Sequence, residues 1–368
     1  MNIKTVGIVG AGYISAAYLK SSFPQFKIVA CADVIPENAN LRAKEFGLEP
    51  LTVDALLADG SIDVVLNLTT PQNHAAISQA ALESGKHVYS EKPFALSREE
   101  AHPLLESAES KQLRIGSAPD TFLGGSHQTV RKLVDDGAIG RPIGGAAFFM
   151  YGGPESWHPN PEFLYQKGAG PVLDMGPYYV TALVNLLGPV KNVLAFGSNA
   201  RPKRTIGSGP RQGTEFAIEV LTYVTAILEF ESGAAVTLTV SFDVAGHNHA
   251  PIEIYGTEGS IQVPDPNYFG GNVRLIRTGG RWTDIAPTHC FADANYRGIG
   301  LADMSAAIVS GKPHRASGQL AYHVLEVLQA ILSKAEGDTS FEIRSTCERP
   351  LSLPAFRQVA DFSTADNR

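Results

Sequence analysis

Lys92 is well placed in this sequence for proton chemistry. It lies in Glu91-Lys92-Pro93, directly after His87–Ser90, which we expect to be a strand of a parallel sheet. Asp174 and Tyr178 are four residues apart, so on a helix their side chains share one face. Oxidation of a carbinol needs a hydride acceptor and a group that takes the hydroxyl proton. Lysine or tyrosine can take this proton when a neighbouring charge favours its basic form.

The stretch Lys4–Lys20 indicates what the hydride acceptor is. An apolar run predicts a buried strand, Gly10-Ala11-Gly12 a tight turn, and Tyr13–Lys20 a helix. This order begins a dinucleotide-binding βαβ unit, in which the pyrophosphate rests against the turn and the N-terminus of the helix. Ser15 stands where the usual pattern has a third glycine, and its small side chain still allows close packing of helix and strand.

Asp33 ends the second apolar run, Phe26–Ala32. An acid there can accept hydrogen bonds from the adenosine ribose, although an aspartate at a strand end can also simply cap a turn. Its charge repels a 2′-phosphate and no arginine follows within Val34–Asn40, so NAD is favoured over NADP. The residues expected to contact the dinucleotide are Gly10, Gly12, Tyr13, Ile14, Asp33, Thr69, Thr70, Pro71, His74, Glu91 and Lys92.

Composition excludes several classes of function. The chain has 368 residues, 44% of them apolar, which is enough for two domains with separate cores. A net charge of −7 disfavours binding to nucleic acid or to an anionic membrane. Neither the three cysteines nor His247 and His249 have the spacing of a metal site, so we predict no metal. With no room for a signal peptide and no apolar stretch that could span a bilayer, we expect a cytoplasmic protein.

The order of the predicted elements indicates an α/β protein. Strands and helices alternate up to Ser117, which predicts a parallel sheet and a dinucleotide-binding domain over residues 1–121. Residues 122–368 form a second domain for substrate binding and oligomerisation, closed by late helices at Leu301–Val309 and Gln319–Ala335. There we expect a hairpin around Gly144–Tyr151 and antiparallel strands at Phe216–Phe230, Ala234–Val244, Pro251–Tyr255 and Ser260–Val263.

Glu91-Lys92-Pro93 and Asp174-Met175-Gly176-Pro177-Tyr178 together resemble the glucose–fructose oxidoreductase/inositol dehydrogenase (Gfo/Idh/MocA) family, over nearly the whole length. The resemblance implies an N-terminal Rossmann fold and a C-terminal α+β domain with an open, mostly antiparallel sheet. It also implies a cis peptide before Pro93 and a homodimer or homotetramer formed through the free face of the second sheet. Members oxidise or reduce a ring hydroxyl of a sugar, glycoside or cyclic polyol.

The family's common pattern is D-x-G-x-H, and Tyr178 stands in place of its histidine. D-x-G-x-Y is similar to the sub-branch that contains glucose–fructose oxidoreductase and dihydrodiol dehydrogenase. Whether Lys92 or Tyr178 is the base therefore stays open, while Lys92, Asp174 and Tyr178 are the expected catalytic residues.

An aromatic loop before Asp174, Gly152–Lys167, suits stacking against the apolar face of a sugar. The residues expected to contact substrate are Lys92, Asp120, Trp157, His158, Tyr165, Asp174 and Tyr178. Arg297, Asp303 and His323, in or beside the late helices, could also reach the cleft.

Two other functions fit the same residues. A glycoside hydrolase could oxidise C3 transiently with NAD, eliminate the C1 substituent after loss of the C2 proton, add water and reduce the ketone again. A non-catalytic sensor could bind the dinucleotide alone, but it would need neither the lysine in E-K-P nor the acid–tyrosine pair.

Overall fold

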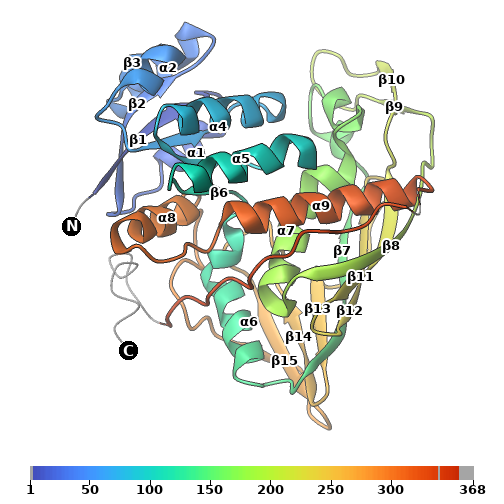
Figure 1. Cartoon of the computed structure of the whole chain (residues 1–368). Coiled ribbons are helices and arrows are strands. Elements are labelled where there is room, and N and C mark those ends of the chain that lie inside the picture. The colour runs from blue at the N-terminus through green and yellow to red at the C-terminus, as the bar shows by residue number, and fades with distance from the viewer. Residues whose placement is uncertain (1–2, 339, 356–368) are drawn as a thin grey trace.

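Two sheets organise the chain in this computed structural model, in which residues 3–338 and 340–355 are described (Figure 1). The first sheet is wholly parallel, and its strands lie in the order β3 (Glu49–Leu51), β2 (Phe26–Ala32), β1 (Lys4–Val9), β4 (Val64–Asn67), β5 (His87–Ser90) and β6 (Ile115–Ser117). From β1 the chain adds strands toward one edge of the sheet up to β3, and then toward the other edge from β4 onward. Doubly wound proteins bind their ligands at this switch point, between β1 and β4.

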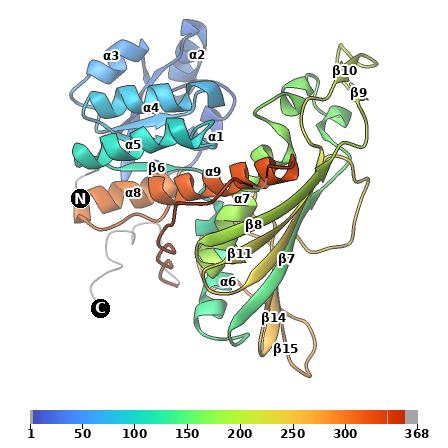
Figure 2. The ribbon, with the colours of Figure 1, turned by 45° about the vertical axis from the view of Figure 1, so that its right-hand side comes forward.

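Helices connect these strands, and α4 and α5 lie side by side (Figure 2). They are α1 (Ser15–Leu19), α2 (Pro36–Phe46), α3 (Val53–Ala58), η1 (Pro71–Asn73), α4 (His74–Glu83) and α5 (Arg98–Ser110). The first is shorter than the sequence predicts, because residues 13, 14 and 20 lie in turns at its two ends. At α5 the Ser97 hydroxyl accepts a hydrogen bond from Glu100 N at 3.2 Å, which caps the helix.

The second sheet has eight strands, antiparallel except for the pair β7 and β12. Its order is β16 (Thr283–Ile285), β15 (Val273–Arg277), β14 (Gly259–Val263), β13 (Ile252–Gly256), β7 (Pro142–Met150), β12 (Ala235–Ser241), β11 (Tyr223–Phe230) and β8 (Val190–Ser198). The open, mostly antiparallel sheet of the sequence analysis is confirmed.

Two strand predictions in this sheet are wrong. Residues 144–151 form no hairpin: β7 runs unbroken between β13 and β12. Its glycines let the neighbouring strands approach closely and do not form a turn. A Cβ on Gly144 would lie 2.7 Å from Ala235 O, and a Cβ on Gly145 would lie 2.5 Å from Glu253 O. The expected strand Phe216–Phe230 is two strands, because β10 (Glu215–Ala217) leaves the sheet to pair with β9 (Lys203–Thr205).

The remaining helices follow β6 in the chain. They are η2 (Thr121–Leu123), α6 (Gly125–Asp135), η3 (Pro154–Ser156), η4 (Glu162–Tyr165), α7 (Gly170–Leu187), α8 (Ile299–Ser310) and α9 (Gly318–Ala335). Helix α9 packs on α7 and β8, but also on α5 and β6 of the first sheet. The late helices therefore belong to both units, and one apolar cluster runs from Val6 through Tyr89 to Leu328. The division at residue 121 stays a prediction.

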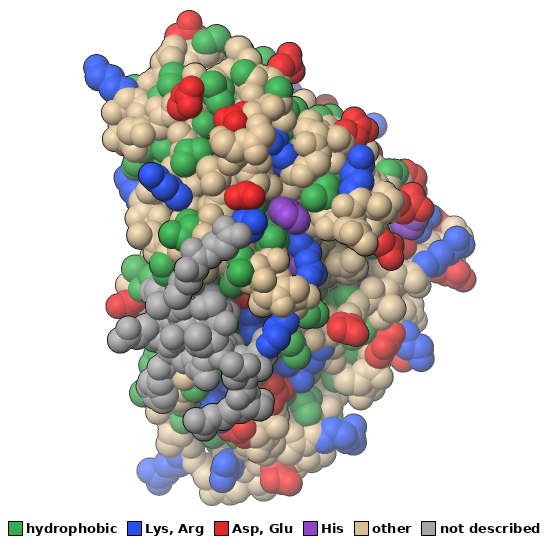
Figure 3. Space-filling model, turned by 60° about the vertical axis from the view of Figure 1, so that its left-hand side comes forward, with side chains coloured by type: hydrophobic (Ala, Val, Ile, Leu, Met, Phe, Trp, Pro, Cys, Tyr) green, Lys and Arg blue, Asp and Glu red, His purple; other side chains and the backbone are tan. Residues whose placement is uncertain are grey.

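The surface has no single charged character on the face shown in Figure 3, where acidic and basic side chains are intermixed. On one face of the second sheet, in contrast, strands β8 and β11 expose large apolar side chains: Leu194 is 58% exposed, Phe196 81%, Ile227 45% and Tyr223 36%. Among the described residues no helix is both long enough and apolar enough to cross a bilayer.

Candidate active site

A glycine turn follows β1 at the carboxyl edge of the first sheet. Gly10 has φ +100°, and a Cβ there would lie 2.5 Å from the backbone of Leu68, so only glycine fits. A Cβ on Gly12 would meet no atom within 4 Å, which leaves open space for a phosphate at this turn. Tyr13 is 95% exposed beside this space, and Ile14 is half-buried. The residues present therefore fit a dinucleotide.

Asp33 lies beside this turn, at the end of β2. Its Oδ2 accepts a hydrogen bond from Ala11 N at 2.8 Å, and its Oδ1 accepts one from Ile35 N at 2.9 Å. The carboxylate is thus held by the backbone of both loops. Next to it Val34 is 89% exposed, which leaves an apolar surface where an adenosine could lie.

The loop after β4 carries the next predicted cofactor residues. Thr70 and Pro71 are exposed at the sheet edge, and the Thr69 hydroxyl donates to Asn67 Oδ1 at 2.7 Å. His74 is only 1% exposed, and its ring bridges Thr69 O at 2.9 Å and Pro93 O at 2.6 Å. This histidine links the loops after β4 and β5 from within the protein.

Lys92 links the two units at the end of β5. Its Nζ donates to Asp174 O at 2.8 Å and to Asp174 Oδ1 at 3.2 Å, and it lies 5.3 Å from the centroid of the Tyr178 ring. The three residues expected to be catalytic, Lys92, Asp174 and Tyr178, therefore lie close together, with the last two on α7. Burial is the largest influence and disfavours the ammonium form, but Asp174, Tyr178 and Glu91 together outweigh it and raise the pKa of Lys92. The peptide before Pro93 is cis, as the resemblance implied.

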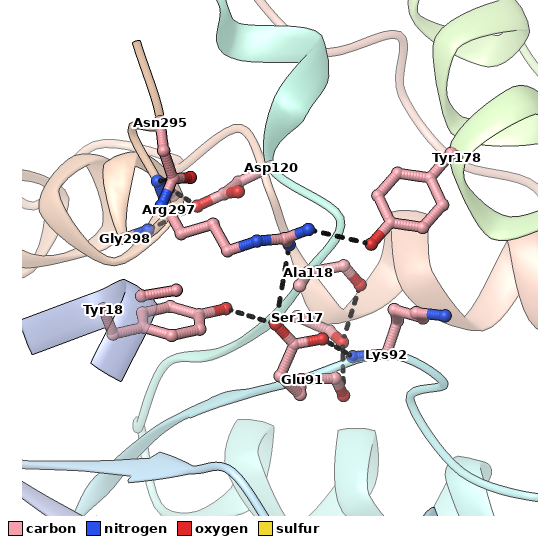
Figure 4. A network of polar contacts seen from close by, with 12 residues as sticks. Tyr18, Glu91, Lys92, Ser117, Ala118, Asp120, Tyr178, Asn295, Arg297 and Gly298 are labelled. Atoms are coloured by element: carbon pink, nitrogen blue, oxygen red, sulfur yellow. Dashed lines mark hydrogen bonds and ion pairs between the residues drawn. The ribbon is translucent and has the colours of Figure 1, made fainter. Parts of the chain in front are cut away.

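Glu91 and Arg297 complete the polar network behind Lys92 (Figure 4). Glu91 accepts hydrogen bonds from the Tyr18 hydroxyl at 2.8 Å and from Lys92 N at 3.0 Å. Arg297 reaches it from the segment before α8, with Nη1 3.8 Å from Glu91 Oε1. The other end of the guanidinium, Nη2, donates to Tyr178 Oη at 3.4 Å.

Asp120 is fully buried under this network. Its Oδ2 accepts hydrogen bonds from Gly298 N and Gly300 N, both at 3.0 Å, while Oδ1 has no partner among the described residues. Burial raises the pKa of Asp120 to about 6. Its carboxylate thus holds the turn that delivers Arg297, a supporting role that the sequence did not suggest.

The aromatic loop is divided into an exposed part and a buried part. Trp157 and Phe163 are 61% and 54% exposed, and each ring lies 5.4 Å from that of His158. Tyr165, in contrast, is fully buried and donates its hydroxyl to Glu155, so it has no free surface to offer a sugar.

Arg204, which the sequence analysis did not single out, fastens this loop to the second sheet. It is 4% exposed and forms ion pairs with Glu155 and Asp243. It also donates to Gly152 O at 2.9 Å and Phe242 O at 2.7 Å. Because no local pattern marks such a contact, only the fold reveals it.

Two late residues do not reach the cleft as the sequence suggested. His323 is buried and accepts a hydrogen bond from Val190 N at 2.9 Å, and Asp303 is buried in an ion pair with Arg315. His247 and His249 lie against Phe148, with the His249 ring stacked 4.1 Å away. Within residues 3–338 and 340–355, no three His, Cys, Asp or Glu side chains group as metal ligands.

Comparison with domain families gives two matches. Residues 4–118 match the oxidoreductase family with an NAD-binding Rossmann fold, and residues 127–262 match the GFO/IDH/MocA C-terminal domain. The first unit is therefore an NAD-binding Rossmann domain, and the cofactor expected from Gly10, Gly12 and Asp33 is confirmed.

Individual proteins agree with these matches. Levoglucosan dehydrogenase of Pseudarthrobacter phenanthrenivorans is 28% identical over 288 residues, covering 70% of this chain and 72% of the relative. scyllo-Inositol 2-dehydrogenase (NAD(+)) of Bacillus subtilis is 27% identical over 285 residues, covering 77% and 78%. A structure of levoglucosan dehydrogenase with NADH and L-sorbose has the same fold, with a TM-score of 0.80 at 23% identity over 94% of this chain and 100% of that one.

Asp33→Asn tests the choice of cofactor, because it removes the charge and keeps one acceptor oxygen for the backbone. By calorimetry we expect the ratio of the Kd values for NADP and NAD to fall by about tenfold, or about 1.4 kcal/mol, as repulsion of the 2′-phosphate is lost. Asp54→Asn, at an exposed position in α3, removes a distant charge and should leave the ratio unchanged. An unchanged ratio in Asp33→Asn would remove Asp33 from cofactor selection.

Proposed function

Because this chain belongs to the Gfo/Idh/MocA oxidoreductase family, we propose that it transfers hydride between NAD and a ring hydroxyl of a sugar, glycoside or cyclic polyol. Levoglucosan dehydrogenase and scyllo-inositol 2-dehydrogenase, two of its relatives, are named for substrates of this class. A cytoplasmic location remains our prediction from the sequence.

One contact carries the proposal: Lys92 Nζ meets Asp174 at 2.8 and 3.2 Å. It brings the NAD-binding edge to the face of α7 that bears Tyr178. Nicotinamides in doubly wound domains lie along this edge. A substrate held over Lys92 and Tyr178 would therefore have its carbinol carbon next to the hydride acceptor.

The residues then divide the chemistry among them. NAD, when bound, supplies the acceptor for the hydride. Lys92 donates hydrogen bonds and can add one to the substrate oxygen, where negative charge develops as the O–H bond breaks. Asp174 holds the lysine in position, and Tyr178 Oη lies within the same polar group to exchange the hydroxyl proton.

The exposed part of the aromatic loop supports a ring-shaped substrate. Trp157, His158 and Phe163 offer ring faces and edges, which suit the C–H face of a pyranose or cyclitol. The buried pair Arg204–Glu155 holds this loop to the sheet, so its position is fixed before substrate arrives.

The exposed apolar face of the second sheet supports a homodimer or homotetramer. Ile227 pairs with Leu194 across β11 and β8, and Thr225 pairs with Phe196, so these side chains form one continuous patch. Monomeric proteins seldom expose large apolar patches, and a second copy of the same patch would cover it.

A panel of levoglucosan, inositols, pyranoses and glycosides, each incubated with NAD, tests the activity. We expect at least one to yield stoichiometric NADH absorbance. Tyr178→Phe removes a single oxygen atom and should lower kcat by about 10²–10⁴-fold through the loss of proton transfer. The Kd for NAD should stay within about twofold, because the phenol is not needed for cofactor binding.

The same incubations distinguish the other two functions. In deuterated water, free sugar with deuterium at C2 and no net NADH would replace our proposal with the redox hydrolase. Tight NAD binding without reduction by any compound, even in a single turnover, would replace it with the sensor.

Phe196→Glu tests the assembly, because it places a charge in the middle of the apolar patch. Sedimentation velocity should show a dimer or tetramer for the wild type and a smaller species for the variant. Val309→Glu, at a 51% exposed position on α8, is the matched control and should keep the wild-type state. A monomeric wild type would contradict the proposed interface.

A further inference from the structure

Arg42 reaches the glycine turn from the next helix, α2, and its side chain is only 17% exposed. Its Nε donates to Ser15 Oγ at 3.0 Å, and its Nη2 donates to Gly12 O at 3.3 Å. The third nitrogen, Nη1, pairs with Glu45 at 2.6 Å. The guanidinium is therefore held against the turn by three acceptors and is not free to swing toward a 2′-phosphate.

Ser15 is the partner that makes this contact possible. It stands where the usual pattern has a third glycine, and its side chain is fully buried. Its hydroxyl donates to Gly12 O at 2.6 Å while it accepts the hydrogen bond from Arg42. A glycine at this position would offer no side-chain acceptor to the arginine. The departure from the pattern thus creates a link between α2 and the turn, beyond allowing close packing.

This link fixes the orientation of one peptide group in the turn. Gly12 O accepts hydrogen bonds from Ser15 Oγ, from Arg42 Nη2 and from Ser15 N, the last at 3.3 Å. A trans peptide is planar, so a carbonyl held toward these donors turns the N–H of Tyr13 the opposite way. Tyr13 is 95% exposed, and a Cβ on Gly12 would meet no atom within 4 Å. The N–H is therefore aimed at the open side of the turn, where a phosphate oxygen can accept from it.

The charge of Arg42 adds to this effect. Helix α1 has only five residues, so few aligned peptide dipoles stand behind the turn. A guanidinium that donates to a peptide carbonyl polarises the peptide and strengthens the N–H on its other side. The pair with Glu45 offsets this charge only partly, because the glutamate is 44% exposed and screened by water.

We propose that Arg42 and Ser15 act as one unit that orients the glycine turn for the pyrophosphate of NAD, with Arg42 as a positioning residue that works through the Gly12 peptide. The inference concerns the cofactor alone and goes beyond the proposed reaction. In the alternative, Arg42 only stabilises α2 through its ion pair with Glu45, three residues further along the same helix.

Two ligands without a nicotinamide test the proposal on the full chain. ADP-ribose carries the pyrophosphate, whereas adenosine fills the place beside Asp33 and carries none. Arg42→Met keeps the apolar stem, and Ser15→Ala keeps the bulk of the side chain. By calorimetry each should raise the Kd for ADP-ribose about tenfold, the effect of one charge-assisted hydrogen bond. The Kd for adenosine, from an NMR titration, should change by less than about twofold, because no phosphate is involved.

The double variant tests whether the two side chains act together. Its Kd for ADP-ribose should exceed that of either single variant by less than about threefold, since the second change removes a link that the first has already broken. Arg42→Lys restores a charge without the planar fork and should recover part of the affinity. Glu45→Gln removes the ion pair, and Lys44→Met removes an exposed positive charge from the same helix; both should stay within about twofold of the wild type.

Three results would overturn the proposal. They are an unchanged Kd for ADP-ribose in Arg42→Met and Ser15→Ala, a double variant whose loss is the product of the two single losses, and an equal loss for ADP-ribose and adenosine. A Glu45→Gln variant as weak as Arg42→Met would establish the helix-stabilising alternative instead. Thermal melting followed by circular dichroism identifies any variant that fails to fold, and Ser15→Ala then carries the test. Because no sugar is present, the result stands apart from any failure to find a substrate.

Discussion

The contact of Lys92 with Asp174 is the constraint on which the site depends. The lysine belongs to the loop after β5, the aspartate to α7, and they lie 82 residues apart in sequence. Both are partly withdrawn from water, with side-chain exposures of 19% and 29%, so removing either partner would leave a partly buried charge unpaired. This cost fixes the start of α7 against the edge of the first sheet. Lys92 of the first unit and Tyr178 of the second then meet at a position that neither unit could create alone.

Single buried charges hold the loops around this contact. Asp120 fastens the turn at Gly298 through two backbone N–H groups, and its carboxyl pKa of about 6 reflects the burial that this requires. Arg204 does the same for the aromatic loop, through Glu155 and Asp243. Loops without regular secondary structure thus gain defined positions from ion pairs and hydrogen bonds, which suits a site that must orient a polar ring.

Local patterns carried the prediction of the first sheet, and the family resemblance carried that of the expected catalytic residues. The glycine turn, Asp33, and the four-residue spacing of Asp174 and Tyr178 all act within one or two elements, so their types and spacing were readable in the sequence. The errors have a different origin. Glycines in β7 read as a turn because only their neighbours in space, Ala235 and Glu253, show that they serve close packing. Arg204 and the burial of Tyr165 likewise depend on distant segments, which leave no periodic signal.

A crystal structure of the protein with NADH bound tests the account most directly. The account predicts that the pyrophosphate lies over Gly12, the adenosine ribose meets Asp33, and C4 of the nicotinamide faces the space between Lys92 Nζ and Tyr178 Oη. In that state Lys92 should keep its contact with Asp174. A nicotinamide directed away from Lys92, or a site formed without α7, would contradict the claim that this contact joins cofactor and substrate.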